Sequence, residues 1–313
     1  MPELPEVHTT VTGLQKVLPR LSITDVWTDL AKKDQHISHF KKTLKDASFY
    51  AHFKKEVIGQ KIVSVERRAK HILINLSSKH TIIIHMKMTG HLMVGTYTYN
   101  KKNNTWNVSD EEKNDALRDP YNRFIHVVFS LSNGTHLVFC DSRKFGTVTL
   151  VNTDKKSDTT FAHLGPEPLD DNFTEKEMVI QLMKRPRMKI KQALMDQTLI
   201  SGIGNIYSDE MLWLSNINPE ENVSTITQAQ LKKLFHAMKE VLEKGIDFGG
   251  DSTSDYRQID GKRGSFHHAH NAYRKTGSPC GKRGCKGVIL RKVIGGRSAH
   301  YCSVHQKLTH GRH

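Results

Sequence analysis

Short runs rich in β-branched residues dominate the first half of the chain and constrain its fold more than any other feature. Four of these runs lie at 62–65, 71–76, 81–85 and 126–129. Turn residues such as Asn133-Gly134 punctuate this part of the chain. Runs of this kind indicate antiparallel strands. We therefore expect an N-terminal antiparallel β-sandwich, with a flanking amphipathic helix over residues 5–18.

Helical patterning follows in the second half of the chain. Residues 164–169 contain two prolines and a glycine, which is typical of a linker. Thr174 begins a capping box ahead of one helix, and Thr227 begins another helix that runs to Gly245. The chain is therefore predicted to be an α+β multidomain protein. Residues 97–118 are polar and charged, and we expect them to form a long, mobile surface loop.

The charge of the chain is basic and unevenly distributed. Its 47 Lys and Arg exceed its 32 Asp and Glu, which gives a net charge of +15. Between Arg257 and His313 there are 13 Lys or Arg and a single acid, Asp260. This excess favours a polyanionic partner, either nucleic acid or an anionic membrane surface. Because the same segment contains three of the four cysteines, it is predicted to be a small stapled module and not a disordered tail.

Other features of the sequence bear on where the protein acts. No run of about 18 apolar residues occurs, and the N-terminus lacks the basic and apolar regions of a signal peptide. Cys140 is remote in sequence from the other three cysteines, which argues against a secreted disulfide framework and favours metal binding. We expect a soluble intracellular protein, in the cytoplasm or at the nucleoid, without a membrane partner.

Residues 1–6 combine a potential nucleophile with a carboxylate. Pro2 is small enough for an aminopeptidase to remove Met1, which would leave a secondary amine beside Glu3. Such an amine can attack an electrophilic sugar carbon and collapse to an iminium, with Glu3 as proton donor. An α-amino group with a pKa near 8 is about one-tenth neutral at pH 7, far more than a lysine near 10.4. The alternative is that Pro2 only precedes a helix.

Further candidate residues lie at predicted turns. Lys70, Met88 and the pair Arg143 and Phe145 each stand where a strand is expected to end. Each of these could alone be a solvated strand end. Two glycines within residues 201–207 lie just before a predicted helix and expose backbone N–H groups suited to a phosphate, although such a pair can also form a simple tight turn.

Together, residues 2–6 and these segments closely resemble the formamidopyrimidine-DNA glycosylase family, which is related to endonuclease VIII. The likeness runs in order from residue 2 to about residue 306. It implies a monomer that binds duplex DNA containing oxidised bases or abasic sites. The domains that we expect are a β-sandwich catalytic domain at 1–150, a linker at 151–173, a helix-two-turn-helix DNA-binding domain at 174–260 and a β-hairpin zinc-finger domain at 261–313.

The resemblance also implies the chemistry of the active site. Pro2 would attack the deoxyribose C1′ as the damaged base departs. Glu3 would protonate the opened sugar, and Glu6 would support the site. The resulting iminium permits β-elimination and δ-elimination, so that base excision is followed by strand cleavage on both sides of the abasic site.

The remaining matches to the family concern DNA binding. Lys70 matches the catalytic lysine that binds phosphate, and Arg297 on the finger hairpin would also hold a phosphate. An enzyme that extrudes its target base must fill the hole left in the duplex, and an apolar wedge beside an arginine can do so. The trio that matches this plug is Met88, Arg143 and Phe145. The residues expected to complete the DNA-binding set are Lys191, Asn205 and Tyr273.

The expected metal site departs from the family pattern. The family has two Cys-x2-Cys pairs, whereas here Cys280-x4-Cys285 is followed by Cys302-x2-His305. Three thiolates and one imidazole still suit one tetrahedral, structural Zn²⁺ ion. In the alternative, His300 or His310 replaces the fourth ligand.

The sequence also bears on the preferred lesion. Leu4 and the plug residues resemble the branch that removes oxidised purines such as 8-oxoguanine, because the endonuclease VIII branch usually has Gly at the position of Leu4. The lesion-gripping loop of the family would fall at 249–256, where Asp251 and Ser252 replace the common Thr-Thr. The alternatives are an endonuclease VIII-like enzyme for oxidised pyrimidines and a catalytically silent zinc-finger DNA-binding protein.

Overall fold

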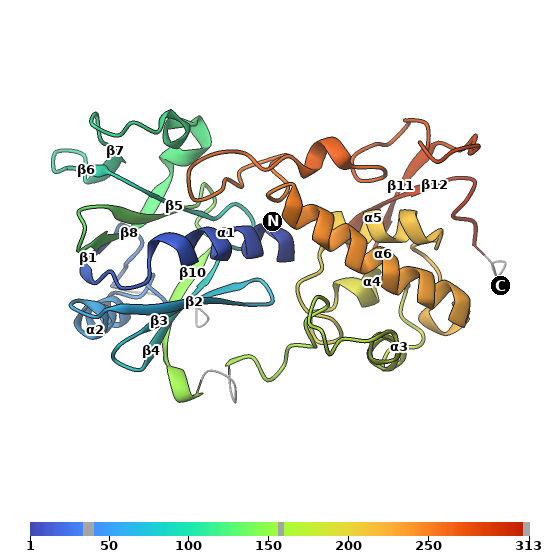
Figure 1. Ribbon diagram of the computed structural model, residues 1–313, viewed down its shortest axis with the longest axis horizontal. Helices are drawn as coiled ribbons and strands as arrows, with labels where there is room; N and C mark the ends of the chain where they lie inside the picture. Colours follow the sequence, from blue (N-terminus) through green and yellow to red (C-terminus); the bar gives the residue numbers. More distant parts are fainter. Residues whose placement is uncertain (34–40, 156–159, 309–313) are drawn as a thin grey trace. The chain divides into compact units, whose positions relative to one another are not determined.

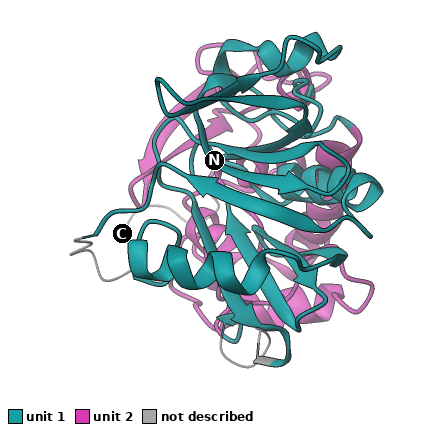
Figure 2. Cartoon of the chain, turned by 90° about the vertical axis from the view of Figure 1, so that its left-hand side faces the viewer, with its two compact units in different colours: residues 1–162, 248–265 teal, residues 163–247, 266–313 magenta. Residues whose placement is uncertain are grey.

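The computed structural model describes residues 1–33, 41–155 and 160–308. The chain divides into two compact units, coloured separately in Figure 2. Unit 1 comprises residues 1–162 and 248–265, and unit 2 comprises residues 163–247 and 266–313. These units are defined by contacts within the fold, whereas the domains expected from the sequence are functional. The boundaries of those domains therefore remain predictions.

Unit 1 is built from two antiparallel four-stranded sheets, and most of its strands are labelled in Figure 1. One sheet has the order β1-β8-β9-β5, with strands β1 (Ile23–Thr28), β8 (Ile125–Leu131), β9 (His136–Cys140) and β5 (His91–Gly95). The other has the order β10-β4-β3-β2, with strands β10 (Thr147–Asn152), β4 (His80–His85), β3 (His71–Leu76) and β2 (Ile62–Arg68). The predicted antiparallel sandwich is confirmed.

Alternating residues of both sheets form one core with the N-terminal helix. Ile72 and Ile74 of β3 and Val127 and Phe129 of β8 are buried in the same cluster as Leu14 of helix α1 (Leu4–Val17). The predicted flanking helix is therefore present. A second helix, α2 (Ala47–Val57), was not predicted; it begins after Asp46, whose side chain accepts a hydrogen bond from the Phe49 N–H at 3.0 Å.

The prediction of a long loop at 97–118 is wrong. Residues of this segment form a hairpin of β6 (Tyr97–Asn100) and β7 (Thr105–Val108), followed by the 3₁₀ helices η2 (Asp115–Arg118) and η3 (Pro120–Arg123). Tyr97 and Leu117 are buried in a small core with Met93 and Val138 of the sheet. The polar sequence did not indicate these elements, because only Tyr97 and Leu117 of the segment are buried in this core.

Unit 2 contains a helical part and a C-terminal hairpin. Its elements are α3 (Glu175–Met183), α4 (Ile190–Met195), α5 (Asn205–Ser215), η6 (Val223–Thr225), α6 (Gln228–Asp247), η7 (Phe266–Ala269), β11 (Ile289–Ile294) and β12 (Arg297–Cys302). The predicted N-cap of α3 is confirmed, since the Thr174 hydroxyl accepts from the Glu177 N–H at 3.2 Å. Among the described residues, no helix is long and apolar enough to span a membrane.

Candidate active site and metal centre

The first turn of α1 fixes the start of the chain. Glu3 is the N-cap residue, and its backbone N–H donates to Oε2 of Glu6 at 2.7 Å. Pro2 is buried, and Glu3 and Glu6 are 2 % and 1 % exposed. A carboxylate near the N-terminus of a helix is favoured by the helix dipole. The sequence therefore folds so that Pro2 and two carboxylates are held together in a protected position.

The second oxygen of Glu6 holds the expected lesion loop. Oε1 of Glu6 accepts a hydrogen bond from the Asp251 N–H at 2.8 Å, and the Tyr256 hydroxyl donates to the Glu6 carbonyl at 3.1 Å. Burial raises the pKa of Tyr256, so its hydroxyl stays a donor. Glu6 thus joins the N-terminal turn to the loop at 249–256. The sequence suggested a supporting role for Glu6 but not this connection.

Lys70 lies in the two-residue turn between β2 and β3. The turn is closed by Ala69, which adopts a left-handed φ of +51°. Lys70 is 6 % exposed, so it is not the solvated strand-end lysine considered above. Beside it, the rings of His71 and His85 meet edge to face at 4.6 Å. Burial, together with the nearby cationic groups, holds the pKa of His85 well below its ordinary value.

The three expected plug residues lie in two turns of unit 1. Met88 follows β4 in a turn where Lys87 has φ +54°, and Arg143 and Phe145 flank Lys144, which has φ +56°. Met88 is half-buried, whereas Arg143 is exposed and the Phe145 ring is 47 % exposed. The Arg143 guanidinium lies 4.6 Å from the centroid of the Phe145 ring. An exposed aromatic ring stacked with a guanidinium suits contact with nucleic acid bases.

Asp141 organises both of these turns, a role that the sequence analysis missed. It is 1 % exposed, and its Oδ1 accepts from the Thr89 hydroxyl in the Met88 turn and from the Arg143 N–H at 3.3 Å. Its Oδ2 accepts from the Gly146 N–H at 2.7 Å. The available signal was an aspartate at the start of a turn, since such side chains commonly accept from following backbone N–H groups.

Lys45 stabilises the turn that carries Arg143 through a hydrogen bond to its backbone. Its Nζ donates to the Lys144 carbonyl at 2.7 Å. Burial lowers the pKa of Lys45 to about 8, although the Asp141 carboxylate opposes this shift. Lys45 was also missed, because it lies far in sequence from the turn that it contacts.

In unit 2, Asn205 begins helix α5 directly after Gly204. Its side-chain Nδ2 lies 3.5 Å from Oγ of Ser298 on β12. Its Oδ1 is buried and has no hydrogen-bond partner among the described residues. Arg297 is exposed at the start of β12, after a turn in which Gly295 and Gly296 both have positive φ. The helix N-terminus and the hairpin tip therefore present polar groups in the same part of unit 2.

Lys191 is fully buried, and its Nζ has several acceptors within the unit. It donates to the Asn205 carbonyl at 2.9 Å, to the Ser208 hydroxyl at 2.8 Å and to Oδ1 of Asp209 at 2.6 Å. Oδ2 of Asp209 lies 2.7 Å from Nδ1 of His300 on β12. Lys191 therefore fixes the start of α5. Any effect of Lys191 on a bound phosphate would be indirect, through the position of Asn205. The Tyr273 ring is part-buried, 5.3 Å from the His300 ring.

The four residues expected to bind a metal come together. The ligand atoms of Cys280, Cys285, Cys302 and His305 all lie within 4.8 Å of one another. Sγ of Cys280 is 3.2 Å from Nδ1 of His305, and the sulfurs of Cys285 and Cys302 are 3.5 Å apart. Such spacings suit one ion bound tetrahedrally by three thiolates and one imidazole. Of the alternative ligands, His300 faces Asp209 and His310 lies outside the described residues.

Neighbouring groups orient these ligands. The Trp213 indole N–H donates to Sγ of Cys280 at 3.3 Å, and Nε2 of His305 lies 3.3 Å from the Trp213 carbonyl. This second contact directs Nδ1 of His305 towards the sulfurs. Burial, and the charge of Lys282, lower the pKa of His305, which favours the neutral imidazole that a metal requires.

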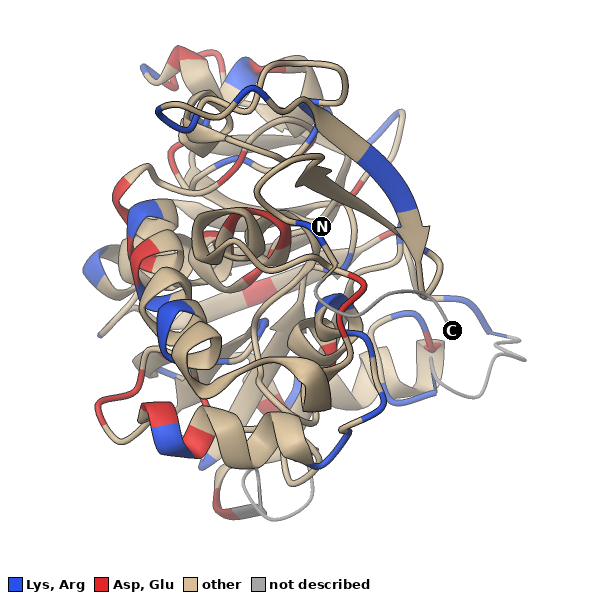
Figure 3. Ribbon diagram, turned by 90° about the vertical axis from the view of Figure 1, so that its right-hand side faces the viewer, with Lys and Arg blue, Asp and Glu red and all other residues tan. Residues whose placement is uncertain are grey.

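Exposed basic side chains cover the metal-binding part of unit 2. Figure 3 shows Lys and Arg along the C-terminal hairpin and its neighbouring loops. The exposed residues are Arg274, Lys275, Arg283, Lys286, Arg291, Lys292 and Arg297. A cluster of this kind favours a polyphosphate backbone as partner.

Comparison with known proteins gives full-length matches. The family models for the formamidopyrimidine-DNA glycosylase N-terminal domain and H2TH domain match residues 1–148 and 164–257. A formamidopyrimidine-DNA glycosylase from Pelotomaculum thermopropionicum is 37% identical over 98% of this chain and 100% of its own length. One from a Ruegeria species is 33% identical, with the same coverage.

Solved structures are similar over the same extent. The Lactococcus lactis Fpg bound to DNA containing an abasic site has a TM-score of 0.79 and 29% identity, and covers 98% of this chain and 100% of its own. A variant of that protein bound to DNA containing Fapy-dG has a TM-score of 0.80 at the same identity and coverage.

Proposed function

Since this chain belongs to the formamidopyrimidine-DNA glycosylase family, we propose that it excises oxidised purines from duplex DNA and then cuts the strand. The substrates would be 8-oxoguanine and formamidopyrimidines, and the enzyme would act as glycosylase and abasic-site lyase. Relatives with this name match 98% of the chain, and structural neighbours were solved with DNA containing Fapy-dG or an abasic site.

We assign the covalent chemistry to Pro2 and Glu3. After removal of Met1, the lone pair of the Pro2 nitrogen forms a bond to C1′, and the C1′–N9 bond breaks as the purine leaves with that electron pair. Glu3 gives a proton to O4′ as the sugar ring opens, and loss of the amine proton completes the iminium. Loss of a C2′ proton then expels the 3′ phosphate, and a second elimination expels the 5′ phosphate.

The observation that carries this assignment is the buried first turn of α1. Glu3 is held beside Pro2 by the bond from its N–H to Glu6, and Glu6 in turn accepts from Asp251 in the loop. A proton donor and a nucleophile on one rigid turn satisfy the need for positioned reacting groups. In the same arrangement, the backbone N–H groups of residues 251–255 are candidates to grip the extruded base.

DNA binding is assigned to groups on both units. Lys70, Asn205 and Arg297 would bind phosphates, with Lys191 acting through Asn205. Phosphate contacts fix the register of the protein on the duplex and make binding salt-dependent. The residues proposed to fill the space of the extruded base are Met88, Arg143 and Phe145, with Tyr273 as a further DNA contact.

We propose that the ion of the Cys280, Cys285, Cys302 and His305 site is Zn²⁺. With four protein ligands, the site leaves no position for a reacting water, so its part is structural. It would hold the hairpin that carries Arg297. The protein would act as an intracellular monomer on duplex DNA.

Borohydride trapping tests the covalent assignment. A duplex with 8-oxoguanine opposite cytosine, or with an abasic site, should give a reduced covalent adduct whose mass locates the DNA on Pro2 after loss of Met1. Pro2→Gly should weaken trapping, and Glu3→Gln should block base release while sparing DNA binding. An adduct that is absent from both duplexes contradicts the proposal.

Matched lysines provide a control for Lys70. Lys79 lies in the β3–β4 turn of the same sheet, also at a positive φ turn, and is exposed. Lys70→Met should abolish strand cleavage, whereas Lys79→Met should retain it. Equal effects of the two substitutions would remove Lys70 from the mechanism.

A lesion panel separates the purine and pyrimidine alternatives. We expect faster excision of 8-oxoguanine and formamidopyrimidine than of thymine glycol. The reverse order would assign the enzyme to the endonuclease VIII type. Binding to all of these duplexes without excision would indicate a silent DNA-binding protein.

A further inference from the structure

Arg257 is a charged side chain that is completely buried in unit 1. Its Nη1 donates to the carbonyls of Ser254 and Tyr256, each at 2.8 Å, and its Nη2 donates to both carboxylate oxygens of Asp119, at 3.0 and 3.2 Å. Burying a guanidinium is costly unless such partners compensate for the lost water. Arg257 therefore connects the backbone of the lesion loop (residues 249–256) to the Asp119 carboxylate, 138 residues earlier in the chain.

Asp119 is held in place partly by contacts that do not involve the Arg257 guanidinium. It caps η3, where its Oδ1 accepts from the Tyr121 N–H at 2.9 Å, and its side chain is only 17 % exposed. The Tyr121 ring centroid lies 4.8 Å from the Arg257 guanidinium. Although burial raises it, the pKa of Asp119 is held below its ordinary value by the Tyr121 N–H and by Arg257 and Arg263. Asp119 stays ionised at neutral pH.

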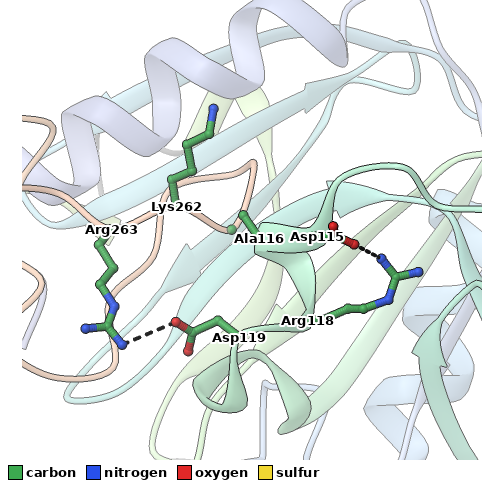
Figure 4. Close-up of a pocket in the computed structure, with 7 residues that line it drawn as sticks. Asp115, Ala116, Arg118, Asp119, Lys262 and Arg263 are labelled. Carbon is green, nitrogen blue, oxygen red and sulfur yellow. Dashed lines mark hydrogen bonds and ion pairs between the residues drawn. The ribbon is translucent and has the colours of Figure 1, made fainter.

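The contact is part of a wider junction between two segments of unit 1. Asn114 Nδ2 donates to the Asp260 carbonyl at 2.7 Å, and a Cβ on Gly261 would lie 2.5 Å from the Ala116 carbonyl oxygen. In Figure 4, Asp115, Ala116, Arg118 and Asp119 lie on one segment, and Lys262 and Arg263 lie on the facing loop. The 3₁₀ helices η2 and η3 thus form a platform for the residues that follow the lesion loop.

The lesion loop is consequently anchored on two sides. At one end Asp251 is bound to Glu6, and at the other Arg257 is bound to Asp119. Between these anchors, Asp255 accepts from the Ser142 hydroxyl at 3.1 Å, beside the turn that carries Arg143. A loop held at both ends has few conformations available, so its backbone N–H groups keep their directions.

We propose that Asp119 and Arg257 are positioning residues. They would hold residues 251–255 of the lesion loop in the conformation that binds the extruded base. This inference rests on the proposed function. The pair matters for the step in which a base is present and not for cleavage of an abasic site, which offers the loop no base to hold. The segment at 109–123 would then be part of the recognition apparatus, although the sequence predicted a mobile surface loop over residues 97–118.

Two variants break the pair and one variant serves as a matched control. Asp119→Ala leaves Arg257 buried without its carboxylate, and Arg257→Met fills a similar volume without charge. Arg263 also faces Asp119, at 3.4 Å, but its side chain is 59 % exposed. Arg263→Met is therefore expected to have little effect, because exposed ion pairs contribute little.

The measurement compares two single-turnover rates for each variant. Excision of 8-oxoguanine should fall about 10- to 100-fold in Asp119→Ala and Arg257→Met, the range expected when reacting groups are displaced by an ångström or less. Cleavage of a preformed abasic site should change less than about twofold, and the double variant should be no worse than the poorer single one. Circular dichroism melting identifies a variant that is not folded, in which case Arg257→Lys and Asp119→Asn replace it.

Equal losses in excision and abasic-site cleavage, or no loss in either, would overturn the proposal. So would an effect of Arg263→Met as large as that of Arg257→Met. If the proposed function itself were wrong, the result would be distinguishable from these outcomes. The unsubstituted enzyme would then neither excise the base nor cut the abasic site.

Discussion

Replacing Asp141 with asparagine should loosen both turns that carry the proposed plug. The carboxylate accepts from Thr89 and Arg143 on one oxygen and from Gly146 on the other. An asparagine of the same shape can accept on only one side. In either orientation of the amide, its NH₂ group would face a backbone N–H, that of Gly146 or that of Arg143, so that two donors would oppose each other.

The expected cost follows from these contacts. One buried N–H left without an acceptor costs about 1–3 kcal/mol, and the hydrogen bonds that lose a charged acceptor weaken further. The Asp141 carboxylate also raises the pKa of Lys45 and so helps to keep it protonated, and this favourable interaction would be lost. We expect the free energy of unfolding of unit 1 to fall by about 2–4 kcal/mol.

Urea unfolding of unit 1 can be followed by tryptophan fluorescence. Two of the three tryptophans, Trp27 and Trp106, lie in unit 1, so Trp213→Phe provides a background in which only this unit reports. Asp110 is exposed and is a suitable control, because Asp110→Asn should change stability by less than about 0.5 kcal/mol. Hydrogen exchange at residues 141–146 should also accelerate in Asp141→Asn.

The same variant should also excise 8-oxoguanine more slowly, because Met88, Arg143 and Phe145, which are proposed to fill the space of the extruded base, are no longer fixed. A stability within about 0.5 kcal/mol of the unsubstituted protein would refute the reasoning, since a buried three-bond acceptor must then be dispensable.

Other predictions concern charge and metal. Between pH 8 and 10.5 the unfolded chain holds a proton that Lys45 has lost in the folded state, so the urea midpoint should rise with pH in this window, and Lys45→Met should abolish that rise. A log–log plot of DNA affinity against salt should have a slope near −4.5 for about five phosphate contacts, and Arg297→Ala should reduce it by about 0.9; a flat plot would exclude the proposed footprint. Removing the metal of the proposed site by chelation, or Cys302→Ser, should weaken DNA binding in anisotropy titrations by loosening the hairpin, and unchanged binding would make the metal dispensable.

Local patterns explain which parts of the fold the sequence predicted. Strands β3, β4 and β8 have β-branched runs bounded by turns, and Thr174 marks the start of α3 with its own side chain. The cysteine spacing also predicted the four residues that lie together in the structure, including the unusual His305. For the strands and the helix, the signal lies within a few residues of the element that it specifies.

Several of the contacts that were missed join residues far apart in the chain. Asp119 and Arg257 are 138 residues apart, and Lys45 and Lys144 are 99 apart. A single sequence gives no register between such segments. The hairpin β6–β7 was missed for another reason, since its strands are four residues long and only Tyr97 of them is fully buried.

The discontinuity of unit 1 has a consequence for synthesis on the ribosome. Residues 248–265 belong to the unit that begins at residue 1, although 85 residues of unit 2 are made between its two parts. Chains emerge N-terminus first, at roughly 5–20 residues per second. For several seconds, therefore, Glu6 and Asp119 have been synthesised while Asp251 and Arg257 have not. During that time Glu6 and Asp119 keep their local backbone partners, the Glu3 N–H and the Tyr121 N–H. The contacts of Asp251 and Arg257 with these carboxylates can form only after synthesis of the last fifth of the chain has begun.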